Sequence, residues 1–223
     1  MTKIILSGVS KQYKIKNKLI LALNNVSFTV DEAAFLAISG PSGSGKSTVL
    51  QLIGGIEPPT FGSIIVGEQN IAKMSSRELT TFRHRNIGII FQQFYLDPTL
   101  TLRQNIELPA MFYNPSKEYR KQRTAELARQ MGLENHLDHH PSELSGGQIQ
   151  RAAIARAVYN RPSIIIADEP TSNLDQDNID VVIRLFKQIQ QAYSTTVIVA
   201  THDMDVVRYA SQIIKLNNGS LVS

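Results

Sequence analysis

A glycine-rich segment between two apolar runs constrains the fold of this chain more than any other feature. Residues 40–48 read GPSGSGKST, which fits the phosphate-loop pattern G-x-x-x-x-G-K-[ST]. The apolar run at 34–38 before it is typical of a buried strand, and the apolar residues after it are typical of a helix. Glycines at such a strand-to-helix turn let backbone N–H groups curve around an anion, which the positive end of the helix dipole also attracts. The segment therefore predicts an α/β fold with a phosphate-binding turn.

Each residue of this turn has an expected role. Lys46 is expected to reach the β- and γ-phosphates of ATP, and the Ser47 hydroxyl is expected to bind Mg²⁺. The remaining residues are expected to surround the phosphates: Gly40, Pro41, Ser42, Gly43, Ser44, Gly45 and Thr48. A glycine-rich turn that carries a lysine by chance is the alternative. The flanking strand and helix favour nucleotide binding.

Composition narrows the class of protein. A chain of 223 residues fits one large domain or one domain with an inserted subdomain, and 42% hydrophobic with 19% charged residues is typical of a soluble globular protein. No apolar run reaches the ~20 residues that span a bilayer, and the absence of cysteine excludes disulfides and thiolate metal sites. We read no signal peptide before the first strand and expect a cytoplasmic protein. The net charge of +4 is more typical of a solvated surface than of a nucleic-acid site.

The order of the predicted elements indicates a mixed α/β architecture. Residues 3–30 predict antiparallel strands, joined by a polar loop at 14–18. Ser75 and Ser76 predict the start of a short helix. Residues 101–141 lack strand signals, and within them residues 116–131 carry apolar side chains at helical spacing. Later strands alternate with helices, which is typical of a mainly parallel, doubly covered sheet. We predict a single domain over 1–223: a phosphate-loop core (about 1–95 and 142–223) with an N-terminal antiparallel β subdomain and an inserted α-helical subdomain (about 96–141, plus the start of the next helix).

An apolar strand in the second half of the chain ends in two carboxylates. Residues 164–167 are followed directly by Asp168 and Glu169. The carboxyl end of a buried parallel strand opens toward the ligand crevice. We therefore expect Asp168 to hold Mg²⁺ and Glu169 to polarise an attacking water. A solvated acidic turn is the alternative.

A second glycine-containing helix start lies just upstream of that strand. Residues 144–148 read LSGGQ, and the bare amides of Ser145, Gly146, Gly147 and Gln148 suit a second anion site. One ATP cannot easily touch both this helix and the phosphate loop if the helical insertion lies between them. A second copy of the chain would then supply the helix. A plain glycine-containing N-terminus is the alternative.

These motifs in this order resemble the nucleotide-binding domain of ABC-type ATPases over essentially the whole chain. The resemblance rests on GPSGSGKST, LSGGQ, the IIIADEP strand, Gln92 in IIFQQF and His202 in VATHD. It implies a head-to-tail homodimer with two ATP molecules, each between the phosphate loop of one chain and the LSGGQ of the other. It also implies that Tyr13 stacks on adenine, that Gln92 contacts Mg²⁺ and the attacking water, and that His202 contacts the γ-phosphate. Asn173, where alanine is common, and Asp31-Glu32, in place of Gly-Glu, depart from the family pattern at no catalytic position.

Finer likeness indicates one branch of that family. FQQFYLDPTLTLRQNIELP and ADEPTSNLD resemble the ATPases of lipoprotein-release and macrolide-export transporters, and also the cell-division ATPase. This resemblance implies a membrane permease as partner, which would hold the chain at the cytoplasmic face of the membrane. Residues 94–96 (FYL) predict the docking surface if they are exposed.

Some of these sequence features are also compatible with other functions and sites. A cell-division-type ATPase that transmits force without transport, and a soluble ABC ATPase acting on nucleic acid, remain alternatives. A non-hydrolysing nucleotide sensor is disfavoured by Glu169 and His202. The histidines at 136, 139 and 140 with Asp138 could suggest a metal, but a solvated loop is the favoured interpretation. The basic residues read as wet helix faces, so no nucleic-acid partner is expected.

Overall fold

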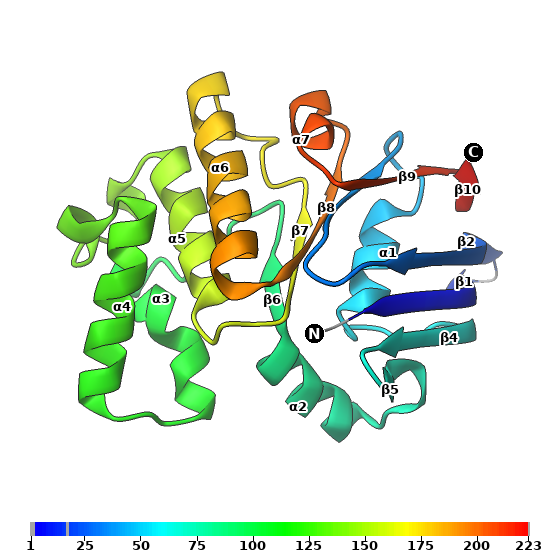
Figure 1. The fold of residues 1–223 in the computed structure, drawn as a ribbon, viewed down its shortest axis with the longest axis horizontal. Helices are drawn as coiled ribbons and strands as arrows, with labels where there is room; N and C mark the ends of the chain where they lie inside the picture. The colour runs from blue at the N-terminus through cyan, green and yellow to red at the C-terminus, as the bar shows by residue number, and fades with distance from the viewer. Residues whose placement is uncertain (1–2, 17, 223) are drawn as a thin grey trace.

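A computed structural model describes residues 3–16 and 18–222 and divides their strands between two sheets (Figure 1). The larger sheet has the order β10-β9-β3-β8-β7-β6, and the smaller one β2-β1-β4-β5. The strands are β1 (Ile4–Ile15), β2 (Lys18–Val30), β3 (Phe35–Ser39), β4 (Phe61–Val66), β5 (Gln69–Asn70), β6 (Ile87–Ile90), β7 (Ile164–Asp168), β8 (Thr196–Thr201), β9 (Gln212–Asn217) and β10 (Ser220–Val222). The helices are α1 (Lys46–Ile53), α2 (Ser76–Asn86), α3 (Leu102–Glu107), α4 (Lys117–Met131), α5 (Gly146–Val158), α6 (Gln176–Tyr193) and α7 (Met204–Arg208). Short 3-10 turns cover 71–73, 108–112, 134–136 and 141–143.

The larger sheet is mainly parallel, as the alternation of strands and helices predicted. Strands β9, β3, β8, β7 and β6 run parallel in that order, and only β10 pairs antiparallel, with β9. The central strands β3, β7 and β8 are buried almost throughout, because apolar residues are needed on both faces of a doubly covered sheet. Their parallel order brings the carboxyl ends of all three to one edge, where the site described below is built.

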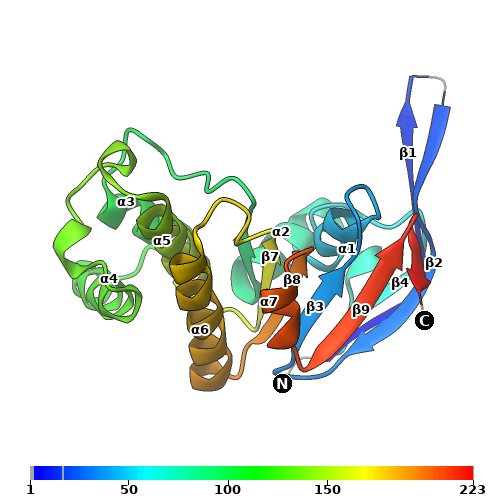
Figure 2. The same ribbon diagram turned by 90° about the horizontal axis from the view of Figure 1, so that it is seen from above.

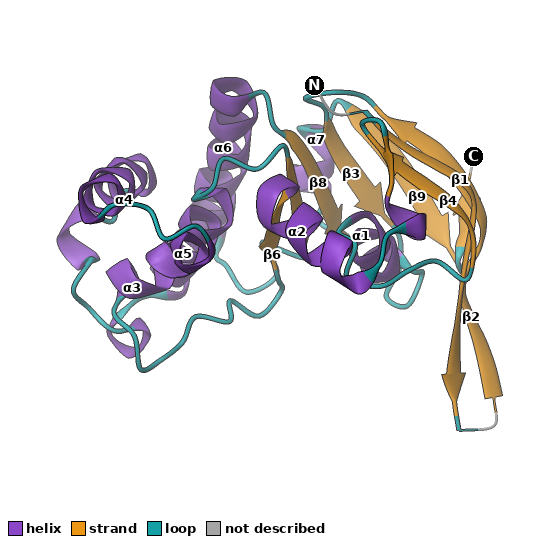
Figure 3. Ribbon diagram, turned by 90° about the horizontal axis from the view of Figure 1, so that it is seen from below, coloured by secondary structure: helices purple, strands orange, loops and turns teal. Residues whose placement is uncertain are grey.

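The smaller sheet carries a long projecting hairpin, formed by β1 and β2 (Figures 2 and 3). The predicted polar loop at 14–18 is shorter than expected, since β1 runs to Ile15 and β2 starts at Lys18. Pairs such as Lys14 with Leu19 and Ile15 with Lys18 continue the ladder. An exposed two-stranded ribbon buries neither face, so polar residues do not interrupt it, and the polarity of 14–18 was a poor guide to its end. Of the two remaining residues of that predicted loop, Lys16 lies in a turn and Asn17 lies outside the described residues.

The segment after β6 holds helices α3 and α4, which Figure 1 shows on the far side of α5 and α6 from the sheet. One hydrophobic cluster nevertheless runs from these helices through α5 and α6 to one face of the sheet. Leu102 of α3, Leu127 of α4, Val158 of α5 and Ile165 of β7 all belong to it. The boundaries of a helical subdomain at 96–141 stay a prediction. None of the helices in the described part of the chain combines the length and apolar character needed to cross a bilayer.

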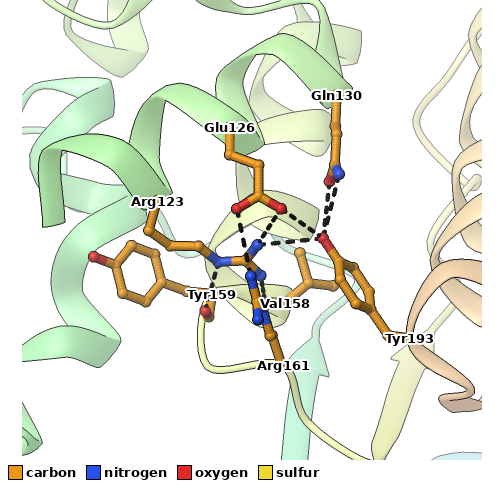
Figure 4. A network of polar contacts seen from close by, with 7 residues as sticks. All are labelled: Arg123, Glu126, Gln130, Val158, Tyr159, Arg161 and Tyr193. Carbon is orange, nitrogen blue, oxygen red and sulfur yellow. Dashed lines mark hydrogen bonds and ion pairs between the residues drawn. The ribbon is translucent and has the colours of Figure 1, made fainter. Parts of the chain in front are cut away.

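A buried arginine ties α4 to the ends of α5 and α6 (Figure 4). The guanidinium of Arg123 donates to the carbonyls of Val158 (2.8 Å) and Tyr159 (3.0 Å), which lie at the end of α5. It also donates to the Tyr193 hydroxyl (3.2 Å) and lies 2.8 Å from Glu126. Burial lowers the pKa of Arg123, but the hydrogen bonds with Tyr193 and Glu126 outweigh it and the pKa is raised. The cluster thus replaces the hydration of a buried charge with four protein contacts.

Candidate nucleotide site

The phosphate loop connects the end of β3 to the start of α1, as its sequence predicted. Gly43 and Gly45 both adopt positive φ, at 76° and 103°. A Cβ on Gly45 would lie 2.8 Å from the Ala22 carbonyl oxygen, so the loop needs glycine there for space as well as for conformation. The turn leaves the first amides of α1 directed at its own concave side, which is a general anion-binding geometry.

Lys46 is buried inside this loop. Its side chain is only 7% exposed, and Nζ donates to the carbonyls of Gly40 (2.9 Å) and Pro41 (3.2 Å). The same ammonium lies 3.6 Å from Oε1 of Glu169, at the end of the neighbouring strand β7. The lysine is therefore held by the loop's own backbone, with its charge at the centre of the phosphate-binding turn.

Two carboxylates follow one another at the carboxyl end of β7. Glu169 takes a left-handed conformation (φ 46°), its N–H donates to the Ala200 carbonyl (2.9 Å), and Oε2 lies 3.0 Å from Nδ1 of His202. The side chain of Glu169 thus lies between Lys46 and His202. A non-glycine residue held in this conformation marks a constrained position, as is common at functional sites.

Asp168 is half-buried at the carboxyl end of β7. Burial raises its pKa; a hydrogen bond from the Ser47 hydroxyl opposes the rise, the charge of Glu169 adds to it, and that of Lys46 opposes it. Oδ1 of Asp168 has no hydrogen-bond partner within the described residues. A buried carboxylate oxygen without a donor, beside a serine hydroxyl, is suited to a small divalent cation.

One cavity collects most of the predicted site residues. It is lined by Ser42, Gly43, Gly45, Lys46, Ser47, Thr48, Gln92, Asp168, Glu169 and His202. Gly40, Pro41 and Ser44 belong to the same loop but do not line the cavity. Nor do the four predicted residues of the second anion site, Ser145 to Gln148. The structure thus brings the phosphate loop, both carboxylates, the glutamine and the histidine together, and keeps the LSGGQ segment apart.

Sequence reasoning missed the hairpin side of this cavity. Ile20, Leu21 and Ala22 of β2 line it, and Ile20 is the cross-strand partner of Tyr13. Tyr13 itself is not among the lining residues, and its hydroxyl contacts Gln51 of α1 at 3.4 Å. Burial and the nearby carboxylate of Glu57 raise the pKa of Tyr13. The sequence signal that could have indicated this side of the cavity was the unbroken apolar run at 19–23. In the structure, most residues of that strand are exposed.

The LSGGQ segment starts α5 with a complete capping box. The Ser145 side chain accepts from the Gln148 N–H, and Oε1 of Gln148 accepts from the Ser145 N–H at 2.8 Å. The Gln148 amide group lies 2.9 Å from Nε2 of His136, which places one of the three loop histidines against this helix start. Groups of three or more side chains suited to a metal are absent from the described residues.

Comparisons with known proteins agree on one family. The ABC transporter family matches residues 23–172 of this chain. MJ0796 of Methanocaldococcus jannaschii, an uncharacterized ABC transporter ATP-binding protein, is 43% identical over 97% of this chain and 94% of its own length. MacB of Escherichia coli, a macrolide export ATP-binding/permease protein, is 40% identical over 100% of this chain and 34% of MacB. A solved dimeric structure of MJ0796 in a post-hydrolysis state, bound to ADP and Pi, matches with a TM-score of 0.92 and 41% identity over 99% of this chain and 97% of that one.

Proposed function

Because the chain belongs to the ABC transporter family and has its ATPase fold, we propose that it is the ATP-hydrolysing subunit of an ABC-type membrane complex. In this proposal, ATP joins two copies head to tail and their closure drives a partner permease. The observation that carries it is the convergence of Lys46, Asp168, Glu169 and His202 on one cavity beside the phosphate loop. This set combines a phosphate cradle, a candidate cation site and a candidate base, which are the parts of a phosphoryl-transfer site.

The geometry of the site supports a separate role for each of these residues. Lys46, held in the centre of the loop, balances the charge of the β- and γ-phosphates, and the loop amides donate to their oxygens. Ser47, Gln92 and Asp168 would hold Mg²⁺, which the donor-free Oδ1 of Asp168 supports. When bound, Mg²⁺ supplies charge to the phosphate oxygens and so lowers the barrier to attack.

Glu169 is the proposed general base. Its carboxylate lies at the end of β7, facing the cavity between Lys46 and His202. From there it would accept a proton from a water that attacks the γ-phosphate, while His202 orients the carboxylate and donates to the phosphate. Gln92, which also lines the cavity, would position the water.

A second copy of the chain would complete the site. The residues at the start of α5 do not line the cavity of their own chain. The capping box uses the N–H groups of Ser145 and Gln148, which leaves those of Gly146 and Gly147 for the ATP of a partner. MJ0796, with which this chain shares its fold, is described as a dimer bound to ADP and Pi. We propose the same use of two copies here, with adenine packed near Tyr13, Ile20 and Leu21.

Phosphate release gives the direct test of this function. The purified full chain is expected to convert ATP to ADP and phosphate when Mg²⁺ is present. The reaction should stop when EDTA removes Mg²⁺, because no cation would then neutralise the negative charge on the phosphoryl group. Phosphate appearing at the same rate with EDTA would contradict the cation site. ATP binding without any phosphate release would favour the nucleotide-sensor alternative.

An apolar groove beside β6 is the proposed docking site for the permease. It is bounded by α2, the edge strand β6, the 3-10 turn at 108–112 and α5. Phe91 and Tyr95 follow β6 in the chain and are not among the residues that line the groove; they stack edge-to-face (5.3 Å), and Tyr95 is 62% exposed. Arg156 of α5 donates to the carbonyls of Phe94 (2.9 Å) and Tyr95 (2.6 Å), so the α5 helix holds this surface in place. Phe94 and Leu96 are half-buried, which leaves Tyr95 as the exposed member of the predicted trio.

Tyr95→Glu is expected to reduce recovery of the permease complex at least about tenfold. A charge at the centre of an apolar interface would remove most of the binding free energy that a hot-spot residue contributes there. ATP affinity of the isolated chain should be unchanged. Co-purification with the membrane permease measures recovery of the complex, and equilibrium binding measures the affinity for ATP. Tyr209→Glu, at an exposed tyrosine after α7, is the matched control. Complex recovered at full yield from Tyr95→Glu would place the permease elsewhere.

The branch of the family bears on the substrate. The identity with MacB, named for macrolide export and carrying its permease in the same chain, supports a partner permease of the macrolide-export or lipoprotein-release type. We propose that the chain lies at the cytoplasmic face of the membrane through that permease. A cell-division-type complex that transmits force without transport is the second candidate, since the motifs are shared.

A further inference from the structure

The two glycines of the LSGGQ segment have different surroundings in their own chain. Among the described residues, an added Cβ on Gly146 would meet only the Asn173 carbonyl, at 3.9 Å. A Cβ on Gly147 would lie 2.1 Å from Oδ1 and 2.6 Å from Cγ of Asn178. Neither glycine has a positive φ, so backbone conformation does not explain the pair. Within the chain, position 147 is confined to glycine by the side chain of Asn178.

Asn178 is not free to move aside. It lies in the first turn of α6, where its backbone N–H and its Nδ2 both donate to Oδ1 of Asp175, at 2.9 Å and 2.8 Å. Its Oδ1 lies 3.4 Å from a guanidinium nitrogen of Arg151, one turn along α5 from Gly147. Displacing the amide would therefore break contacts with both helices.

The segment that precedes Asn178 starts at the candidate base. The Ser172 N–H and hydroxyl both donate to the Glu169 carbonyl, at 3.3 Å and 3.0 Å. Asn173 donates to the Gln92 carbonyl at 3.5 Å. The chain then passes Asp175 and enters α6. Residues 172–178 thus run from the cavity of one chain to the helix start that the same chain offers to a partner.

We infer that Asn178 is a positioning residue that fixes the start of α5 against residues 172–175 through its contact with Gly147. The inference rests on the proposed function where it concerns ATP: the placement of Ser145 to Gly147 decides how well their amides fit the partner's phosphate. It assigns the second glycine a role in packing within the chain, beside any contact with nucleotide. Asn178 touches no reacting atom and acts through α5 alone.

Thermal unfolding of the full chain without nucleotide tests the contact itself. Gly147→Ala should melt about 2–4 °C below Gly146→Ala, since only the first places a Cβ against Asn178. Adding Asn178→Ala to Gly147→Ala should bring most of that difference back, because the clash is gone. The backbone cap on Asp175 survives this change, as the N–H of residue 178 remains. Equal melting of the two glycine variants, or no recovery in the double variant, would overturn the contact.

ATP-dependent dimerisation tests the consequence. In a Glu169→Gln parent, Asn178→Ala should weaken the dimer about tenfold, a typical coupling between touching residues, while ATP affinity of the monomer stays unchanged. Asp180→Ala, on the exposed face of the same helix, is the control and should dimerise as the parent does. If Asn178→Ala leaves dimerisation of the Glu169→Gln parent unchanged, the positioning role is overturned and the proposed function is not. The same conclusion follows if Asn178→Ala lowers the affinity of the monomer for ATP. A parent that never dimerises contradicts the proposed function, and the melting comparison still decides on the Gly147 contact.

Discussion

An ATP-bound dimer is expected to accumulate when Glu169 is replaced by glutamine. The amide keeps the shape of the side chain but cannot take a proton, and loss of general-base catalysis typically lowers the rate by ~10²–10⁴. It also removes a negative charge that lies 3.6 Å from Lys46 and would face the γ-phosphate. Both effects favour the closed state, whereas the parent chain should elute mainly as a monomer. Size-exclusion chromatography with Mg²⁺ and ATP measures the species, and phosphate release measures the rate.

Ser145→Arg in the Glu169→Gln background separates the sandwich from other dimers. The serine hydroxyl caps α5 and the residue lies at its amide-bearing end, so an arginine would remove the cap and fill the space proposed for the partner's ATP. The double variant is expected to elute as a monomer with ATP affinity intact. A dimer that survives this change would show that the α5 start does not face the partner's nucleotide.

Lys46→Ala is expected to lower phosphate release by at least ~10²–10³ and to weaken ATP binding, because the charge at the centre of the loop is lost. Lys46 is not a simple surface charge, since it is 7% exposed and bound to two loop carbonyls. Pro41 is exposed and Gly40 is half-buried, so water can replace the ammonium at both carbonyls in the variant and the fold should survive.

Circular dichroism and nucleotide titration of Lys46→Ala, beside Lys121→Ala on the exposed face of α4, distinguish a site effect from a general charge effect. Lys121→Ala should retain full activity. Unchanged turnover in Lys46→Ala would remove the lysine from the site, whatever its position in the loop.

The sequence was sufficient for the parts of the site that lie at strand ends. The phosphate loop, Asp168 with Glu169, and His202 each follow a buried apolar strand, and carboxyl ends of adjacent parallel strands meet at one edge. Such positions depend on local pattern and on a general rule of topology. The roles assigned to Gln92, Tyr13 and His202 came instead from the family resemblance, and remain predictions.

Other features depend on contacts between distant segments, which local pattern does not encode. Ile20, Leu21 and Ala22 line the cavity because a hairpin folds beside α1, and the polar residues of that hairpin indicated a loop. The reason for glycine at 147 lies 31 positions away, at Asn178. In the sequence the two LSGGQ glycines look alike, and only the packing of α6 against α5 distinguishes them.

The arginine cluster in Figure 4 limits how the helical half of the molecule can move. Rotating α4 away from the ends of α5 and α6 would strip Arg123 of acceptors that are buried with it, and breaking a buried charge contact of this kind costs about 3–5 kcal/mol. We therefore expect α4, α5 and α6 to move as one rigid unit, held together by the contacts of the Arg123 guanidinium. The LSGGQ segment lies at one end of α5, and Arg156, which binds the Phe94 and Tyr95 carbonyls, lies near the other end. A movement at the proposed permease site would therefore be transmitted through α5 to the proposed contact with the partner's nucleotide.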